Sequence, residues 1–167
     1  MAEQVLPVAL MAQEQTSWCW AAVASAVSAL RHGGAHPRQC EIAALVLHTA
    51  NCCSHPHLNN VTARLQDALR AVNVPAALQP SDMLSPQLVF GQIVERQAPI
   101  GARILDSTNG QAHFVLLIGC DPATQDVVCA DPWGAVGTPA PRYRMPLMKM
   151  QNDYGGWGVC TDICLLS

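Results

Sequence analysis

Residues 18–30 constrain the fold more than any other part of the chain, because this stretch is apolar nearly all round. Thr16 and Ser17 offer side-chain oxygens that can cap a helix, and no Gly or Pro interrupts the segment before Gly33 and Gly34. A helix without a polar face belongs inside a core rather than on a surface. We therefore predict a helix here, in the middle of the core.

The size of the chain suits a single domain around such a core. Of its 167 residues, half are apolar and only 13% are charged, which is typical of a folded globule and not of a disordered chain. We predict one domain over residues 1–167.

Charge and hydropathy exclude two classes of partner. Nine basic against twelve acidic residues leave a formal charge of −3, so we expect no nucleic-acid partner. No apolar run approaches the roughly 20 residues that span a bilayer, so we expect no membrane insertion. Residues 1–12 contain no Lys or Arg, which predicts the absence of a signal peptide. The protein is then either cytoplasmic or exported by a signal-independent route.

Helical patterns come first along the chain and strand-like patterns afterwards. Apolar residues at helical spacing predict further helices over residues 37–48 and from 60 or 61 to 72. A Pro-rich linker at 74–85 precedes a short helix that ends at about 97. Short runs between turn signals then predict strands at 100–105, 113–118, 126–130, 141–145 and 159–166. This order predicts an α+β fold with an antiparallel sheet.

The chain has eight cysteines, at positions 19, 40, 52, 53, 120, 129, 160 and 164. If one is reserved for chemistry, the remaining seven cannot all pair, so we expect most to be buried as small apolar residues. For a disulfide, the nearest candidates are Cys40 with either Cys52 or Cys53.

A zinc site is the competing interpretation of the segment around Cys52. Cys52, Cys53, His55 and His57 stand within six residues, and Cys40 or His48 could join them. Adjacent cysteines, however, chelate one tetrahedral ion poorly, and the spacing fits no standard structural site. We favour a loop with a disulfide and keep a zinc-stabilised interaction module as the alternative.

Three residues have the chemistry of a nucleophilic site. Cys19 lies in the first turn of the predicted central helix, where free N–H groups and the helix dipole stabilise a thiolate. His113 begins an apolar strand and Asp131 ends the next one. The two are symmetric about position 122, inside a turn signal, so a hairpin would place them side by side. Nucleophile, base and orienting carboxylate form a triad, and the Gln13 amide could donate to an oxyanion beside the Cys19 N–H.

These residues resemble the active-site segments of papain-like cysteine proteases. Gln13 stands six residues before Cys19, Trp20 follows it, and the sequence after the second strand reads Asp131-Pro132-Trp133-Gly134. The pattern is most similar to a bacterial group that includes plant-pathogen effector proteases, and more distantly to bacteriocin-processing peptidases. Plant and lysosomal members differ by an Asn in place of Asp131 and by a second upstream cysteine.

The resemblance implies a papain-like two-lobed fold. A helical lobe would occupy about residues 13–75, a linker and short helix about 76–97, and a β lobe about 98–167. The active site would lie between the lobes.

The resemblance also implies the role of each site residue. Cys19 would be the nucleophile, His113 the base, Asp131 its orienting partner and Gln13 the oxyanion donor. Trp20 and Trp133 would support the site, with Trp133 shielding the His113–Asp131 hydrogen bond from water.

The implied activity is endopeptidase hydrolysis of a protein or peptide substrate through a thioester, with no metal or organic cofactor. A bacterial effector or toxin role would bring a cognate inhibitor or immunity protein as a further partner. Deamidation or acyl transfer could use the same triad, and a non-catalytic interaction module is the alternative of another class.

Overall fold

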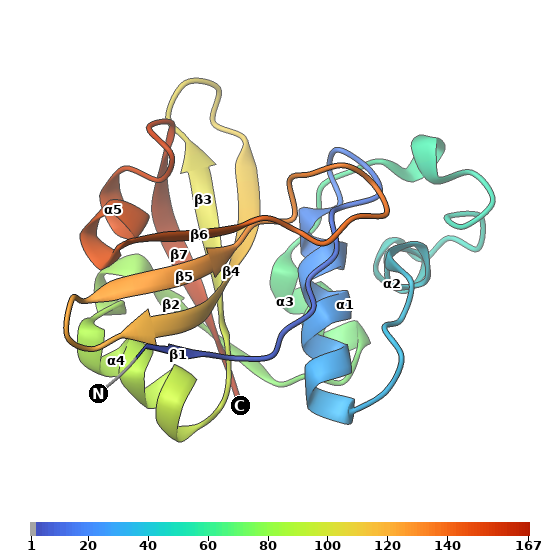
Figure 1. Cartoon of the computed structure of the whole chain (residues 1–167). Helices are drawn as coiled ribbons and strands as arrows, with labels where there is room; N and C mark the ends of the chain where they lie inside the picture. The colour runs from blue at the N-terminus through green and yellow to red at the C-terminus, as the bar shows by residue number, and fades with distance from the viewer. Residues whose placement is uncertain (1–2) are drawn as a thin grey trace.

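The computed structural model describes residues 3–167 and has an α+β architecture, as the order of helical and strand patterns predicts (Figure 1). The α-helices are α1 (Cys19–His32), α2 (Gln39–Leu47), α3 (Leu65–Ala71), α4 (Pro86–Phe90) and α5 (Leu147–Asn152). The shorter turns of helix are η1 (Pro56–Asn59), η2 (Ser81–Met83) and η3 (Gly91–Glu95). The strands are β1 (Gln4–Val5), β2 (Ala76–Pro80), β3 (Ile100–Asp106), β4 (Ala112–Asp121), β5 (Asp126–Ala130), β6 (Arg142–Pro146) and β7 (Gly158–Leu166).

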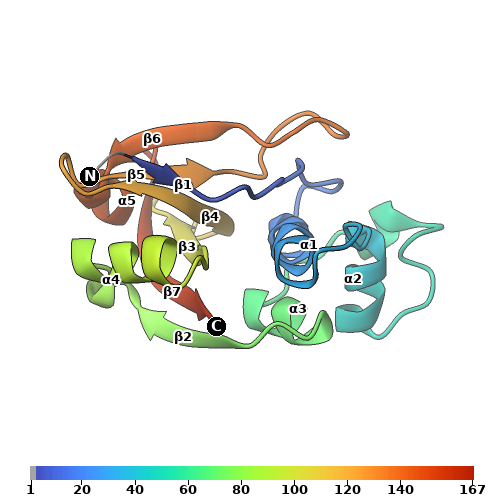
Figure 2. The same ribbon diagram turned by 60° about the horizontal axis from the view of Figure 1, so that its bottom comes forward.

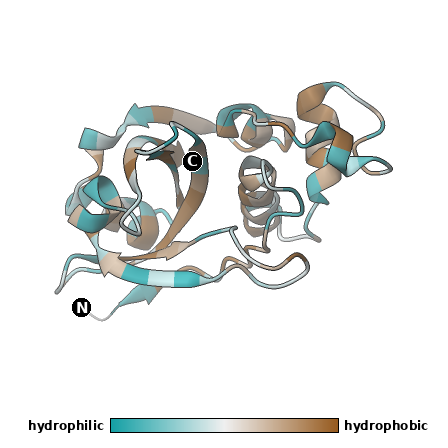
Figure 3. Ribbon diagram, turned by 90° about the horizontal axis from the view of Figure 1, so that it is seen from above, coloured by the Kyte–Doolittle hydropathy of each residue, from teal (hydrophilic) through white to brown (hydrophobic). Residues whose placement is uncertain are grey.

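All the strands join one antiparallel sheet in the order β2-β7-β3-β4-β5-β6, and β1 also pairs with β4. Helices α1, α2 and α3 pack on one another at one side of this sheet (Figures 1 and 2). Seen from above, apolar residues are concentrated along the central strands (Figure 3). No helix within residues 3–167 is long and apolar enough to cross a membrane.

Helix α1 is the centre of the molecule, as its apolar sequence predicts. Every residue from 19 to 28 is buried, because α2 and α3 cover one side of the helix and β4 covers another. The helix ends where Gly33 adopts the left-handed conformation (φ 63°), which glycine accepts without steric cost.

Two sequence-based predictions about secondary structure were wrong in detail, and one helix was missed. The third helix begins at Leu65 and not at 60 or 61, because Asn60 bonds back to the loop before α1 and residues 60–64 stay non-helical. Residues 76–80 form β2, not linker. This strand lies at the sheet edge, where a proline is tolerated. Helix α5 was not predicted.

The segment that precedes α1 is part of the core. Leu6, Val8, Leu10 and Ala12 are buried, each alternating with an exposed residue. Backbone hydrogen bonds hold the segment first to β4 and then to the loop after β5, so that it runs from the sheet towards α1 (Figure 2). Sequence analysis assigned no structure to these residues.

Candidate active site

Cys19 is the first residue of α1 and is 5% exposed. The residue that precedes the helix is Trp18, and no side chain caps it, so the predicted cap by Thr16 or Ser17 is wrong. The first N–H groups of a helix have no partner within the helix. Cys19 therefore lies at the N-terminus of α1, which is the positive end of the helix dipole.

Across from Cys19, His113 on β4 lies beside Asp131, which follows β5. His113 Nε2 and Asp131 Oδ1 are 2.6 Å apart, so the predicted contact between these residues forms. The predicted register of the hairpin between β4 and β5, however, is wrong. The turn is centred between Ala123 and Thr124, because Asp121 pairs with Asp126, and an irregularity interrupts β4 further on. Extending the register places Asp131 diagonally from His113, within reach on the same face of the sheet.

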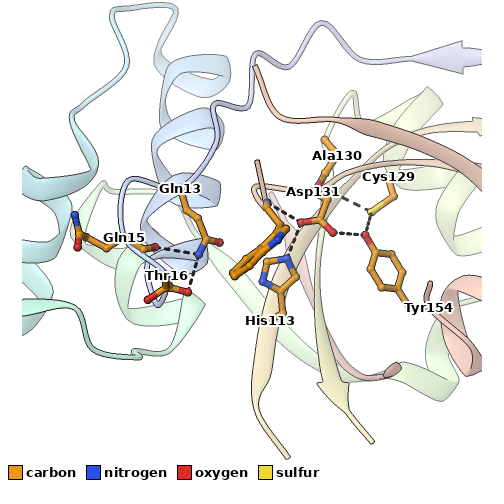
Figure 4. Close-up of polar contacts among 9 residues, drawn as sticks. Gln13, Gln15, Thr16, His113, Cys129, Ala130, Asp131 and Tyr154 are labelled. Carbon is orange, nitrogen blue, oxygen red and sulfur yellow. Dashed lines mark hydrogen bonds and ion pairs between the residues drawn. The ribbon is translucent and has the colours of Figure 1, made fainter. Parts of the chain in front are cut away.

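Asp131 is 6% exposed, and both of its oxygens have partners (Figure 4). Besides His113, the backbone N–H of Trp133 donates to Oδ1 at 2.9 Å, and the hydroxyl of Tyr154 donates to Oδ2 at 2.7 Å. Burial raises the pKa of the carboxyl, but the hydrogen bond and charge of His113 and the other two donors outweigh it and lower the pKa below the ordinary value. Asp131 is therefore an ionised carboxylate with a fixed orientation.

His113 is an imidazolium at neutral pH in this environment. Burial lowers its pKa, but hydrogen bonds to Asp131 and to the Cys19 side chain, together with their charges, raise the pKa to about 9. Because Nε2 is bonded to Asp131, Nδ1 is the ring nitrogen left for Cys19. The rings of Trp133 and Trp157 flank the imidazole, with centroids 6.3 and 6.2 Å away.

Gln13 is buried beside the loop that leads into α1. Its Nε2 donates to the backbone oxygens of Gln15 and Thr16, at 2.9 and 2.7 Å (Figure 4). Both amide hydrogens are thereby engaged, while Oε1 is buried without a partner. The amide predicted to donate to an oxyanion is thus bound to the loop itself.

The two tryptophans predicted to support the site have different environments. Trp20 is buried and its Nε1 donates to the backbone oxygen of Val61 at 3.2 Å, so it fastens the start of α1 to the segment before α3. Trp133 is 61% exposed although it contacts His113. It lies at the rim of a groove that is lined by Cys19, Trp20, His113, Asp131, Trp133 and Trp157 among others.

Sequence analysis missed Tyr154 and Asn60 as members of this site. Asn60 holds the loop before Cys19, since its Oδ1 accepts from the Ser17 N–H and its Nδ2 donates to Thr16 Oγ1, both at 2.8 Å. For Tyr154, the available signal is the sequence Tyr-Gly-Gly-Trp-Gly at 154–158, which is a tight turn that carries two aromatic rings.

The cysteine-rich segment forms a disulfide. Cys40 pairs with Cys53, the second of the two predicted candidates. The six free cysteines are all buried, as expected for small apolar residues. Within residues 3–167, no group of three or more His, Cys, Asp or Glu side chains could hold a metal ion, so the ligand cluster of the zinc alternative does not form there.

A thiol at the start of a buried helix, facing an imidazole that a carboxylate holds on a neighbouring sheet, defines the papain type of cysteine protease. The family model described as papain-like cysteine protease AvrRpt2 matches residues 2–140, and the chain belongs to this family. It is a cysteine peptidase, as the sequence resemblance implies.

The fold has a solved counterpart. Xylellain, a cysteine protease from Xylella fastidiosa, superposes with a TM-score of 0.55 at 10% sequence identity, over 98% of this chain and 85% of xylellain. At this identity the likeness shows the papain-like fold alone. No curated protein sequence matches the chain.

Proposed function

We propose that the protein is an endopeptidase that cleaves a protein substrate through the triad Cys19, His113 and Asp131. The observation that carries this proposal is the 2.6 Å contact of the His113–Asp131 pair, which leaves one imidazole nitrogen for Cys19 in an open groove. The charged imidazole supports the role of its partner as a thiolate nucleophile.

In the proposed reaction, the Cys19 thiol has passed its proton to His113 Nδ1, and the thiolate attacks the carbonyl carbon of the scissile bond. His113 then gives this proton to the leaving amine as the C–N bond breaks, which leaves a thioester on Cys19. Water attacks the thioester, its proton goes to His113, and the thiolate departs with the acid product released. Asp131 keeps the ring oriented throughout, and its charge stabilises the imidazolium at each step in which it forms.

The oxyanion would be bound at the N-terminus of α1. The Cys19 backbone N–H is available there as one of the first amides of the helix. Gln13 is the proposed second donor. Because both hydrogens of its Nε2 are directed to the carbonyls of Gln15 and Thr16, donation to the oxyanion requires one of these bonds to break.

We also propose a role as a bacterial effector or toxin that acts on a protein of another organism, with a cognate inhibitor or immunity protein as a second partner. The similarity of Gln13, Cys19 and Trp20 to the active-site segment of plant-pathogen effector proteases supports this role, as does membership of the AvrRpt2 family. Mapping new protein N-termini in host cells that express the wild type or Cys19→Ala tests it. New termini only with the wild type are the expected result, and identical termini would refute it.

Incubation of the purified chain with a peptide library, followed by mass spectrometry, tests the peptidase proposal. We expect cleaved peptides with the wild type and with Cys120→Ala, a buried cysteine on β4, and none with Cys19→Ala. Peptides that are deamidated without cleavage would instead establish a side-chain amide as the group that is hydrolysed. Peptides that are crosslinked without cleavage would establish an amine as the acceptor. Unmodified peptides, or cleavage that survives Cys19→Ala, would refute the triad.

A further inference from the structure

The carboxylate of Asp131 has a second face that the triad does not use. Oδ1 is directed to His113, whereas Oδ2 is directed into the interior and accepts the hydrogen bond from Tyr154 at 2.7 Å (Figure 4). Tyr154 is 3% exposed, and it lies 23 positions after Asp131 and outside residues 2–140 that the family model matches. The contact therefore joins the site to a part of the chain that the family model does not match.

The groups around this contact keep the Tyr154 hydroxyl protonated, so that it donates a hydrogen bond to Asp131. Burial, together with the Cys129 and Asp131 side chains, raises the pKa of the Tyr154 hydroxyl far above its ordinary value, so the hydroxyl stays protonated. Cys129 Sγ lies 3.7 Å from the Tyr154 oxygen, and burial raises the pKa of this thiol well above neutrality too. Cys160 on β7 adds only a thiol whose pKa burial raises to about 12. On its Oδ2 side, the carboxylate is thus bounded by protonated, uncharged groups.

The backbone turn that carries Tyr154 also places a ring against His113. Tyr154 bridges to Gly158, and between them Trp157 packs edge-on against the Tyr154 ring, with centroids 5.5 Å apart, and 6.2 Å from His113. Gly155 has a φ of 59°, and a Cβ there would lie 2.7 Å from Trp157 Nε1. The turn is therefore built so that both rings fit together beside the His113–Asp131 pair.

We propose that Tyr154 is a positioning residue of the active site, whose hydroxyl fixes the Asp131 carboxylate so that Oδ1 stays on His113. The arrangement extends the triad to a chain of Cys19, His113, Asp131 and Tyr154. The inference rests on the proposed roles of Cys19, His113 and Asp131, and it adds a residue that acts through Asp131.

Loss of the hydroxyl has two opposite effects on the titration of the site. Without the donor on Oδ2, the Asp131 carboxylate is less stabilised and takes up a proton at higher pH. A carboxylate that can rotate also holds the His113 proton less firmly, so the imidazolium loses it at lower pH. The pH range in which thiolate and imidazolium coexist becomes narrower from both sides. The titratable side chains that face the pair are Cys19 on α1, Cys129 on β5 and Tyr154 itself, and burial holds the pKa values of Cys129 and Tyr154 far above their ordinary values.

Tyr154→Phe tests the inference, because it keeps the packed ring and removes only the hydroxyl. We measure the rate at which iodoacetamide alkylates Cys19 from pH 4 to pH 10, a readout that needs no substrate. The expected result is an alkylation profile whose acid limb moves to higher pH, and a bell-shaped pH profile of peptide cleavage that narrows on both limbs. We expect kcat on a cleaved peptide to fall on the order of tenfold with KM nearly unchanged. Tyr143→Phe, which alters an exposed tyrosine on β6, is the matched control and should keep the wild-type profile.

A double-mutant cycle separates positioning from a general effect on folding. If Tyr154 acts through Asp131, Tyr154→Phe should change neither the alkylation profile nor kcat when it is added to Asp131→Ala. Limbs that stay at wild-type pH in Tyr154→Phe, or effects that add fully to those of Asp131→Ala, would overturn the inference. Failure of the wild type to cleave any peptide would refute the proposed function. The alkylation profile needs no substrate and would still test the role of Tyr154, so the two failures are distinguishable.

Discussion

Asn60 and Ser17, 43 positions apart in the chain, are joined by a hydrogen bond of 2.8 Å from the Ser17 N–H to Asn60 Oδ1. The neighbours of Asn60 make similar contacts. The indole N–H of Trp18 donates to the Asn59 backbone oxygen at 2.9 Å, and that of Trp20 donates to Val61. The segment at 59–61 thus fixes the backbone that presents Cys19.

Asn60→Ala should lower kcat/KM on the order of tenfold, because the loop before Cys19 loses two hydrogen bonds and the nucleophile loses its alignment. Asn60→Asp keeps the acceptor for Ser17 and loses the donor to Thr16, so its activity should lie between those of the wild type and Asn60→Ala. Steady-state peptide cleavage measures both. Asn152→Ala, an exposed asparagine on α5, is the control, and equal activity in all variants would show that the loop is held without Asn60.

The stability of the protein should fall as the pH rises through about 9. The pKa of His113 is raised from 6.5 to about 9 in the folded state, so the folded chain binds a proton there that the unfolded chain releases. The contribution of His113 is fully present below pH 6.5 and is lost between pH 6.5 and 9. Urea unfolding at a series of pH values measures it. His113→Gln should remove this part of the dependence and His36→Gln, at an exposed histidine, should not.

Asp131→Asn and Asp131→Ala separate orientation from charge. The Asn oxygen can still accept from His113 Nε2, so Asp131→Asn should keep substantial activity while the alkaline limb of its pH profile moves down. Asp131→Ala loses orientation as well and should lower kcat/KM by about tenfold or more. Trp133→Ala should show a milder form of this defect, since water then reaches the His113 hydrogen bond. Wild-type rates in both Asp131 variants would make Asp131 a turn residue.

Local sequence was sufficient to predict the parts of the molecule that depend on one segment. The apolar helix after Trp18, the strand at 126–130 and the pairing of Asp131 with His113 all follow from patterns within one element or one hairpin. The register of the hairpin could not be predicted in this way, because the turn is centred between Ala123 and Thr124 and not at position 122, and a further irregularity lies between Leu117 and Gly119.

The missed residues depend on contacts between distant segments. Tyr154 bonds to a carboxylate 23 positions earlier, and Asn60 bonds to an amide 43 positions earlier. Neither residue type is unusual where it stands, so nothing in its own neighbourhood reveals the partner. Strand β2 is recognisable only beside β7, because its edge position is what accommodates Pro80.

Cys19 should be the first of the free cysteines to react with iodoacetamide near pH 6. It is the cysteine that bonds to a charged imidazole, and a thiolate is the reactive form. The other five are buried without such a partner. Burial raises the pKa of Cys52, Cys120, Cys129, Cys160 and Cys164, in the last two to about 12. Peptide mapping after brief labelling identifies the modified residue. His113→Ala should slow the labelling of Cys19 at this pH, whereas preferential labelling of Cys52 or Cys160 in the wild type would contradict the assignment of the nucleophile.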